Sequence, residues 1–325
     1  MRLCIPIADR PEGGLYTFLR YLRAWAEREG VEVCDDIESD YDVLFANSFV
    51  VPFESLRAAH ERLPDVRIVH RVDGSAEDYG RDPADDRRQA RASVMADATV
   101  FQSRYSRYAT CRKSRIVASR GVVIPNPVDT VRFCPEGERE PLPGECRVAH
   151  VTFSTNPRKG ATAVLEAARA NPDMQFILIG RYAEDDVPAN VTRVGMADHV
   201  RLPGLLRSCH ALAFFSENES CPNVVLEGLA SGLPVLYRDS GATAELVGDA
   251  GLATTPERFG DALTTIMQQR LHWAMRARRR AEDAFALDRI MPRYIGVLRS
   301  VRRRRTPVRW RMAWRSLRGY PVRYT

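Results

Sequence analysis

Two glutamates, Glu219 and Glu227, lie eight residues apart in the stretch FSENESCPNVVLEGLASGLPVLY. Between them, Pro222 suits the first position of a helix, where its missing N–H leaves no hydrogen bond unmade. Gly232 suits the left-handed residue that ends a helix. We therefore predict a buried helix over residues 222–231, with Glu219 in the loop that faces its N-terminus and Glu227 inside it.

The start of this predicted helix is suited to bind an anion. The backbone N–H groups of Asn223 and Val224 have no partner within the helix, and the helix dipole is positive at this end. A carboxylate beside a bound anion would repel it, so Glu219 makes best sense as an acceptor for hydroxyl groups of the same ligand. Glu227 could accept in the same way from a ribose diol. A glutamate taken singly more often faces solvent, but the combination favours a sugar nucleotide.

A second group of charges lies in VTFSTNPRKGATAVLEAARA, where Arg158 and Lys159 follow a predicted strand at the point where a helix should begin. Cations at a helix N-terminus oppose its dipole by ~0.3 to 1 kcal/mol each. Their placement therefore indicates an anionic ligand between them. The alternative is a pair of solvated surface charges.

Two further loops carry candidate residues in the first half of the chain. Gly13 and Gly14 lie at the first strand-to-helix turn, where paired glycines let the backbone approach a ligand. The third glycine of a G-x-G-x-x-G fingerprint is missing, which disfavours a nicotinamide-dependent oxidoreductase. In HRVDG, His70 follows a predicted strand and is either a structural residue or a contact to a sugar or acceptor. The carboxylate of Asp73 could orient an acceptor hydroxyl.

The elements that must position these residues form two α/β domains. Short aliphatic runs alternate with helical periods throughout, which is typical of parallel α/β layers. A segment rich in Pro, Gly and charge separates the two halves and is the expected hinge. Two such domains facing each other make a cleft, and open α/β sheets bind ligands at the carboxyl ends of their strands. The expected parts are an N-terminal acceptor-side domain 1–130, a linker 131–146, a nucleotide-sugar-binding domain 147–285, a crossover helix 286–300 and a basic tail 301–325.

The motifs together resemble those of the family 4 retaining glycosyltransferases of the GT-B fold, also called glycosyl transferases group 1. Glu219 and Glu227 match the Glu-x7-Glu signature of that family, in which the first Glu lies at the donor sugar and the second binds the nucleotide ribose. Lys159 matches the diphosphate loop, and Gly13 lies in a loop that resembles the family's GG loop before the first helix. The stretch around Asn126 resembles the segment before the interdomain linker. The resemblance runs from about Arg10 to Leu298.

The resemblance implies two facing Rossmann-like domains and transfer of a sugar from a nucleoside diphosphate sugar to an acceptor hydroxyl with retention of configuration. It implies no cofactor and no metal, because protein cations compensate the diphosphate charge. Contacts near Gly195 and Met196 would select the base. Many members carry a further Arg upstream of the diphosphate loop, where this chain has Phe153 and Ser154. That departure keeps open a non-catalytic module that binds nucleotide sugars.

Charge is distributed unevenly along the chain. Ten of its 48 basic residues lie between Arg299 and Thr325, which leaves 38 basic against 42 acidic residues in the body. The acidic body argues against a nucleic-acid partner. In the tail, Trp310 and Trp314 share one helical face and arginines another, as in a basic helix at a membrane interface. We expect peripheral attachment to an anionic membrane, which would suit a lipid-linked acceptor.

Composition and cysteine usage indicate the compartment. No apolar run approaches the ~18 residues of a membrane span, and MRLCIPIADR is too short and too soon polar for a signal peptide. The seven cysteines are scattered without a C-x2-C pair, which predicts reduced thiols with no zinc site and no disulfide framework. The sequence therefore predicts a cytoplasmic protein, in which peripheral membrane attachment would be on the inner face of the membrane.

Overall fold

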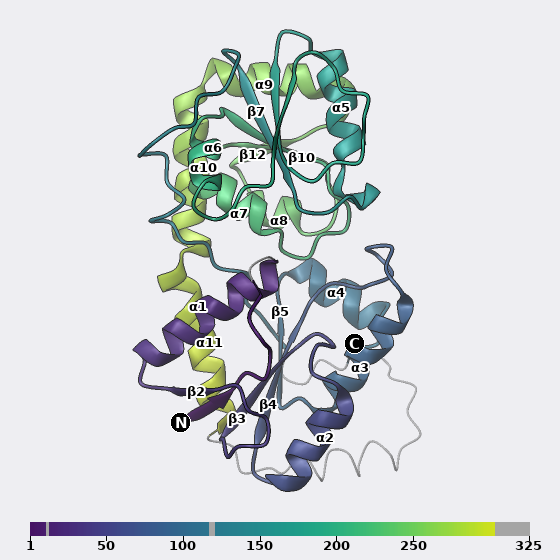
Figure 1. The fold of residues 1–325 in the computed structure, drawn as a ribbon, viewed down its shortest axis with the longest axis vertical. Helices are drawn as coiled ribbons and strands as arrows, with labels where there is room; N and C mark the ends of the chain where they lie inside the picture. Colours follow the sequence, from purple (N-terminus) through teal and green to yellow (C-terminus); the bar gives the residue numbers. More distant parts are fainter. Residues whose placement is uncertain (11–12, 117–120, 303–325) are drawn as a thin grey trace. The chain divides into compact units, whose positions relative to one another are not determined.

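The computed structural model describes residues 1–10, 13–116 and 121–302 of the 325-residue chain. These residues form two compact units. The first contains Met1–Ile124 together with the residues from Met291 onward, and the second contains Pro125–Ile290. Each unit is an α/β structure with helices on its parallel sheet (Figure 1). This arrangement confirms the predicted fold class of two Rossmann-like domains.

The first unit contains a six-stranded parallel sheet in the order β2-β1-β3-β4-β5-β6. Its elements are β1 (Arg2–Cys4), α1 (Gly14–Arg28), β2 (Glu32–Cys34), β3 (Val43–Asn47), α2 (Phe53–Arg62), β4 (Arg67–Val72), α3 (Pro83–Met95), β5 (Ala98–Phe101), α4 (Arg104–Arg112), β6 (Val122–Val123) and most of α11 (Leu287–Arg302). The predicted apolar repeat after Gly14 is confirmed as α1, which buries Phe18, Leu19 and Leu22.

Helix α11 packs with α1 in this unit. The Tyr294 ring lies 4.9 Å from that of Phe18, and its hydroxyl donates to the Ile124 carbonyl at 3.2 Å. Arg299 lies 3.2 Å from the Glu29 carboxylate at the end of α1. The last described helix therefore belongs to the same core as the first helix of the chain, although residues 29–286 lie between α1 and α11 in sequence.

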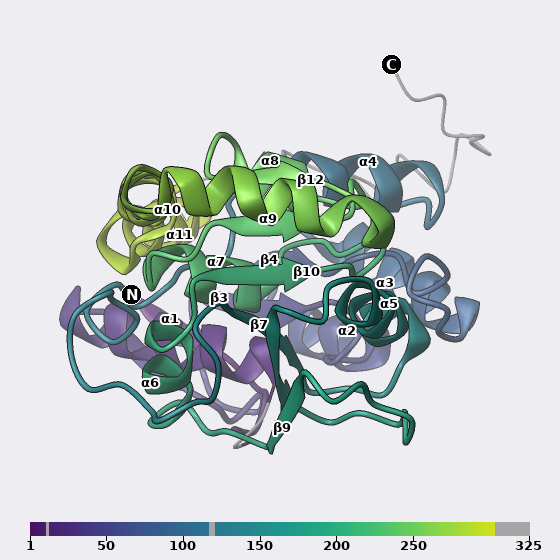
Figure 2. The same cartoon turned by 90° about the horizontal axis from the view of Figure 1, so that it is seen from above.

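The second unit contains another six-stranded parallel sheet, in the order β12-β11-β10-β7-β8-β9. Its elements are β7 (Arg147–Thr152), the 3-10 turn η1 (Pro157–Lys159), α5 (Ala161–Ala170), β8 (Gln175–Gly180), β9 (Val191–Gly195), α6 (Leu202–Arg207), β10 (Ala211–Phe214), α7 (Asn223–Ala230), β11 (Val235–Tyr237), α8 (Thr243–Val247), β12 (Gly251–Ala253), the 3-10 turn η2 (Pro256–Arg258), α9 (Phe259–Gln268) and α10 (Arg270–Phe285). Figure 2 views the chain from above, with α9 and α10 in front.

Alternating side chains of β10 show how helices cover both faces of this sheet. Ala211 and Ala213 belong to the apolar cluster formed with α5 and α9. Leu212 points to the other face, where a Cβ on Gly228 of α7 would lie 2.8 Å from its side chain. A glycine at position 228 therefore lets α7 approach the strand closely, and this fixes the helix that carries Glu227.

Residues 125–146, which include the expected linker, are bonded to the second unit. The guanidinium of Arg207 donates to the backbone carbonyls of Arg132, Cys134 and Glu138 at 2.9 to 3.0 Å. Arg278 of α10 also donates to the Thr130 and Phe133 carbonyls, so two arginines hold the middle of the segment. Within the described ranges, no helix is long and apolar enough to cross a membrane. The basic tail, including Trp310 and Trp314, lies outside these ranges.

Candidate functional site

The candidate site of the second unit lies at the carboxyl edge of its sheet. The chain runs from β7 to β8 and β9 on one side, and then returns to β10 and its neighbours on the other. The order therefore reverses between β7 and β10, and ligands of open α/β sheets bind outside the carboxyl ends at such a point. The loop after β7 carries Arg158 and Lys159, and the loop after β10 carries Glu219.

Arg158 and Lys159 lie in the 3-10 turn η1, one residue before α5 begins. The Asn156 side chain caps this turn by accepting from the Arg158 N–H at 3.0 Å. Gly160 ends it in the left-handed conformation, with φ of 80°, and a Cβ there would lie 2.5 Å from the carbonyl carbon of Phe215. Only glycine lets the turn pack so closely on the loop after β10.

Hydrogen bonds then join the two loops. The Arg158 carbonyl accepts from the Glu217 N–H at 2.8 Å, and the Lys159 carbonyl accepts from the Ser216 hydroxyl at 3.0 Å. The structure therefore brings the basic pair and the first glutamate together, although about 60 residues separate them in sequence.

The Lys159 ammonium lies 2.5 Å from Oε1 of Glu219, a side chain that is 8% exposed. Burial raises the pKa of Glu219 to about 8. The ammonium acts in the opposite direction because it favours the carboxylate. The Glu219 backbone is held as well, since a Cβ on Gly241 would come within 2.6 Å of it and the Glu219 carbonyl accepts from the Ala242 N–H. The result is a buried ion pair on a rigid loop.

Helix α7 spans Asn223–Ala230, which agrees with the predicted helix to within one residue at each end. Asn223 and Val224 lie at its first turn and are partly exposed, with Pro222 as the preceding cap residue. Glu227 is buried inside the helix, and burial raises its pKa to about 7. A carboxyl buried on a helix that begins at an anion-binding end is suited to accept hydrogen bonds from a polar ligand.

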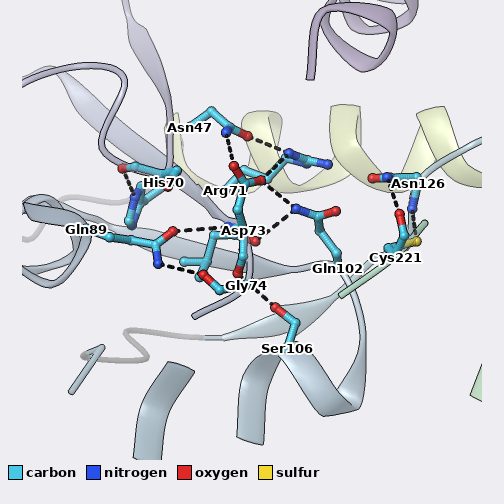
Figure 3. A network of polar contacts seen from close by, with 12 residues as sticks. Asn47, His70, Arg71, Asp73, Gly74, Gln89, Gln102, Ser106, Asn126 and Cys221 are labelled. Carbon is cyan, nitrogen blue, oxygen red and sulfur yellow. Dashed lines mark hydrogen bonds and ion pairs between the residues drawn. The ribbon is translucent and has the colours of Figure 1, made fainter. Parts of the chain in front are cut away.

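The loop before α7 is fixed by Asn126, as Figure 3 shows. Its side-chain amide donates to the Cys221 carbonyl at 3.0 Å. The amide also donates to Oδ1 of Asn223 at 2.8 Å. The Asn126 N–H also donates to the Cys221 sulfur at 3.3 Å. The motif around Asn126 therefore holds the helix end where the anion would bind.

In the first unit, Asp73 follows β4 and is the centre of the polar network in Figure 3. Its Oδ1 accepts from Arg71 at 3.1 Å and from Gln102 at 2.7 Å, and its Oδ2 accepts from Asn47 at 3.0 Å. The donors Asn47 and Gln102 lie at the carboxyl ends of β3 and β5. The carboxylate is 42% exposed, so it is fixed in orientation and still accessible.

His70 does not follow the strand, as the sequence had suggested, but lies inside β4, which continues to Val72. It is fully buried, with Nε2 2.7 Å from the Ser48 carbonyl, and burial lowers its pKa to about 4. The strand continues through the polar residues His70 and Arg71 because both faces of β4 are buried. Because the side chain reaches no solvent, the structure favours a structural role for His70 over a contact to a sugar or acceptor.

The remaining candidates lie at the carboxyl edges of the two sheets. Gly13 precedes α1 with φ of 116°, and Gly14 is the first residue of that helix. Because the strand order of the first unit reverses between β1 and β3, the loop after β1 lies at its switch point. Gly195 ends the outer strand β9, and Met196, which is 39% exposed, follows it.

Sequence reasoning missed several residues that support these loops. The buried His150 ring lies beside Tyr182, with Nδ1 2.9 Å from the Tyr182 hydroxyl. Arg238 follows β11 and pairs with Glu217. Asp86 is buried and accepts from the backbone of Ala76 and Glu77 and from two serine hydroxyls. Its only sequence signal was its place in the first turn of a helix behind Asp82-Pro83.

Comparison with known families defines the class of the protein. The family described as "Glycosyltransferase Family 4" matches residues 2–132, and the family described as "Glycosyl transferases group 1" matches residues 148–269. The first match covers the sheet of the first unit, and the second match covers the sheet of the second unit. The chain belongs to the family 4 glycosyltransferases with the GT-B fold, and it is a glycosyltransferase. This assignment removes the oxidoreductase alternative.

Solved structures share the fold over nearly the whole chain. Anabaena HepE, in complex with UDP, is 18% identical with a TM-score of 0.72, covering 92% of this chain and 99% of that one. Sucrose-phosphate synthase from Thermosynechococcus elongatus is 17% identical with a TM-score of 0.73, covering 92% and 98%. WaaG, a glycosyltransferase involved in lipopolysaccharide biosynthesis, is 14% identical with a TM-score of 0.64, covering 91% and 99%. No curated protein is significantly similar in sequence.

Proposed function

We propose that this glycosyltransferase transfers a sugar from a nucleoside diphosphate sugar to an acceptor hydroxyl, with retention of configuration and without a metal ion. The observation that carries the proposal is the buried ion pair between Lys159 and Glu219 at the switch point of the second sheet. A buried carboxylate is costly unless it is paired, so both charges are held where a charged and hydroxyl-rich ligand would use them.

The donor would bind with its diphosphate at the start of α7. The backbone N–H groups of Asn223 and Val224 and the cations of Arg158 and Lys159 supply positive charge there. Glu219 would accept hydroxyls of the sugar, and Glu227 would accept the ribose diol. The HepE structures with UDP and with UDP-glucose support this kind of ligand for the shared fold. Gly195 and Met196 are our candidates for contacts to the base.

The reaction would proceed on one face of the sugar. The bond between the anomeric carbon and the phosphate oxygen breaks, and the acceptor oxygen forms its bond on the same face. The acceptor proton passes to the departing phosphate oxygen, so no protein nucleophile is required. Lys159 and Arg158 would stabilise the charge that develops on the diphosphate, the role that a metal ion has in other transferases. No group of three or more potential metal ligands occurs among the residues with described positions.

The acceptor side of the proposal rests on the first unit and on the tail. Asp73, fixed by Arg71, Asn47 and Gln102, would orient the acceptor hydroxyl. The Gly13-Gly14 turn, at the switch point of the first sheet, would contact a substrate. The arginine-rich tail would attach the protein to the inner face of an anionic membrane from the cytoplasm, which suits a lipid-linked acceptor in cell-envelope glycan or glycolipid synthesis.

A panel of UDP- and GDP-sugars, offered in EDTA with a lipid extract as acceptor source, tests the proposal. We expect nucleoside diphosphate release from one donor, and proton NMR of the product should show the same anomeric configuration as the donor. An inverted product would overturn the retaining mechanism. Binding of the donors without release would instead favour the non-catalytic module.

A further inference from the structure

A buried hydroxyl lies in the loop that leads into α7 in the second unit. Ser220 follows Glu219, is 5% exposed, and precedes the first helical residue, Asn223, by three positions. Its Oγ is fully covered, and none of the described residues forms a hydrogen bond with it. Most buried hydroxyls in proteins are hydrogen-bonded, because burying an unbonded polar group costs free energy. Packing alone therefore does not explain a serine at this position.

The backbone is fixed on both sides of Ser220. The Glu219 carbonyl accepts from the Ala242 N–H at 2.8 Å, and the Cys221 carbonyl accepts from the Asn126 side chain at 3.0 Å. These bonds fix the position of the Ser220 Cβ and leave rotation about the Cα–Cβ bond as the freedom of the side chain. The hydroxyl has three staggered positions about that bond, and no hydrogen bond to a described residue holds it in one of them. It can therefore turn toward a ligand without breaking a bond.

The chemistry on either side of Ser220 defines the ligand group that suits this hydroxyl. Before it, the Glu219 carboxylate is paired with the Lys159 ammonium. After it, the N–H groups of Asn223 and Val224 lie in the first turn of α7, where backbone donors have no partner within the helix. Phosphate oxygens only accept, and a serine hydroxyl can donate. A diphosphate bound at this helix end would therefore offer Ser220 a charged acceptor.

We infer that Ser220 is a further donor-binding residue, whose hydroxyl turns to donate a hydrogen bond to a diphosphate oxygen of the nucleotide sugar. The inference rests on the proposed donor site. The unbonded hydroxyl destabilises the free protein, and it gains a partner only in the complex. Removal of the hydroxyl should therefore weaken diphosphate binding without weakening the fold, whereas removal of a hydroxyl that is bonded within the protein would weaken the fold.

Ser220→Ala removes the hydroxyl and keeps the backbone contacts on both sides. We expect this variant to bind UDP or GDP, whichever the wild type prefers, roughly 10- to 100-fold more weakly, which is the effect of losing a hydrogen bond to a charged group. Its affinity for the matching nucleoside should stay unchanged. The urea concentration at the midpoint of its unfolding should equal or exceed that of the wild type. Calorimetric titration in EDTA and urea unfolding measure these quantities.

Ser231→Ala is the matched control, because Ser231 lies at the opposite end of α7 and is 4% exposed. Within the described part of the chain its hydroxyl also has no hydrogen-bond partner. The control should bind both ligands as the wild type does. If Ser220→Ala does not fold by circular dichroism, Ser220→Cys replaces it, because a thiol has nearly the same shape and is only a weak donor. It should show the same selective loss.

The inference is overturned if a folded Ser220→Ala, or its Ser220→Cys replacement, binds the diphosphate as tightly as the wild type. An equal loss in Ser231→Ala would overturn it too, because the effect would then not depend on the helix end. A lower urea midpoint for Ser220→Ala would show that the hydroxyl is already bonded in the free protein, which also contradicts the inference. Failure of the proposed function is seen separately, since the wild type itself would then bind neither diphosphate more tightly than its nucleoside.

Discussion

At the scale of single residues, the spacing of charged side chains indicated a candidate donor site, whereas their burial and their partners could not be predicted. Glu219 and Lys159 could be proposed because each lies in a short motif with Pro or Gly beside it. That they form an ion pair could not be predicted, because about 60 residues separate them. The role of Asn126 was equally hidden, since its partners lie on another loop and at the start of α7.

Replacement of Glu219 tests its role as the sugar contact. Glu219→Ala should nearly abolish transfer, by roughly 100- to 1000-fold in kcat, while the fold stays intact. It removes a hydroxyl acceptor and leaves the Lys159 ammonium without its carboxylate. Glu217→Ala is the matched control, because Glu217 is a partly exposed neighbour paired with Arg238. Wild-type turnover by a folded Glu219→Ala enzyme would contradict the assignment.

The raised pKa of Glu227 predicts a pH dependence of nucleoside binding. A ribose diol donates to the carboxylate, and protonation near pH 7 removes one accepting oxygen. Affinity for the nucleoside should therefore rise as the pH increases toward about 7 and level off above it. The Glu227→Gln variant should bind weakly with a flat profile. Calorimetric titration between pH 5.5 and 8.5 measures both, and parallel profiles would exclude Glu227 as the titrating group.

At the scale of elements, ten of the described strands were visible in the sequence, and the outer strands β9 and β12 of the second sheet were not. The residues of β9 alternate irregularly between partly buried and exposed, and β12 has only three residues. Neither VTRVG of β9 nor GLA of β12 contains the continuous aliphatic run that is typical of a central parallel strand. For β4 the strand itself was predicted but its end was placed too early, because His70 and Arg71 are polar but buried.

The close approach of η1 to the loop after β10 predicts a large cost for a side chain at position 160. Gly160→Ala places a Cβ 2.5 Å from the Phe215 backbone in a left-handed conformation. Gly195→Ala is the stability control, because Gly195 has φ of 77° and nothing within 4 Å of its Cβ position. The control should lose about 1 to 2 kcal/mol of unfolding free energy. Urea unfolding should show a clearly larger loss for Gly160→Ala, and equal losses would mean that the loops are not held together.

At the scale of the whole molecule, the sequence predicted two α/β domains and a last helix that returns to the first. The structure places the residues of α11 from Met291 onward in the first unit, bonded to α1 and to Ile124. The alternation of aliphatic runs made the two sheets visible. The boundary between the units was harder to predict, because residues 125–146 are irregular in sequence and are held by side chains distant in the chain, among them Arg207 and Arg278.

The tail predicts membrane attachment of the whole protein. Four consecutive arginines, Arg302 to Arg305, precede the tryptophans, and each basic residue contributes ~1 kcal/mol near an anionic surface. The full chain should float with anionic vesicles at low salt. A chain ending at Arg302, which keeps the buried Val301 of α11, should not. Equal flotation of the two chains would remove the membrane proposal and its implication for a lipid-linked acceptor.

The central claim is that protein cations bind the donor diphosphate at the carboxyl edge of the second sheet. Calorimetric titration of the wild type and Lys159→Ala with UDP and GDP in EDTA tests it most directly. We predict that one nucleotide binds without metal and that Lys159→Ala loses about 2 to 4 kcal/mol of its binding free energy, with nucleoside affinity unchanged. Binding that requires added Mg²⁺ or Mn²⁺, or equal affinity of Lys159→Ala and wild type, would contradict the account.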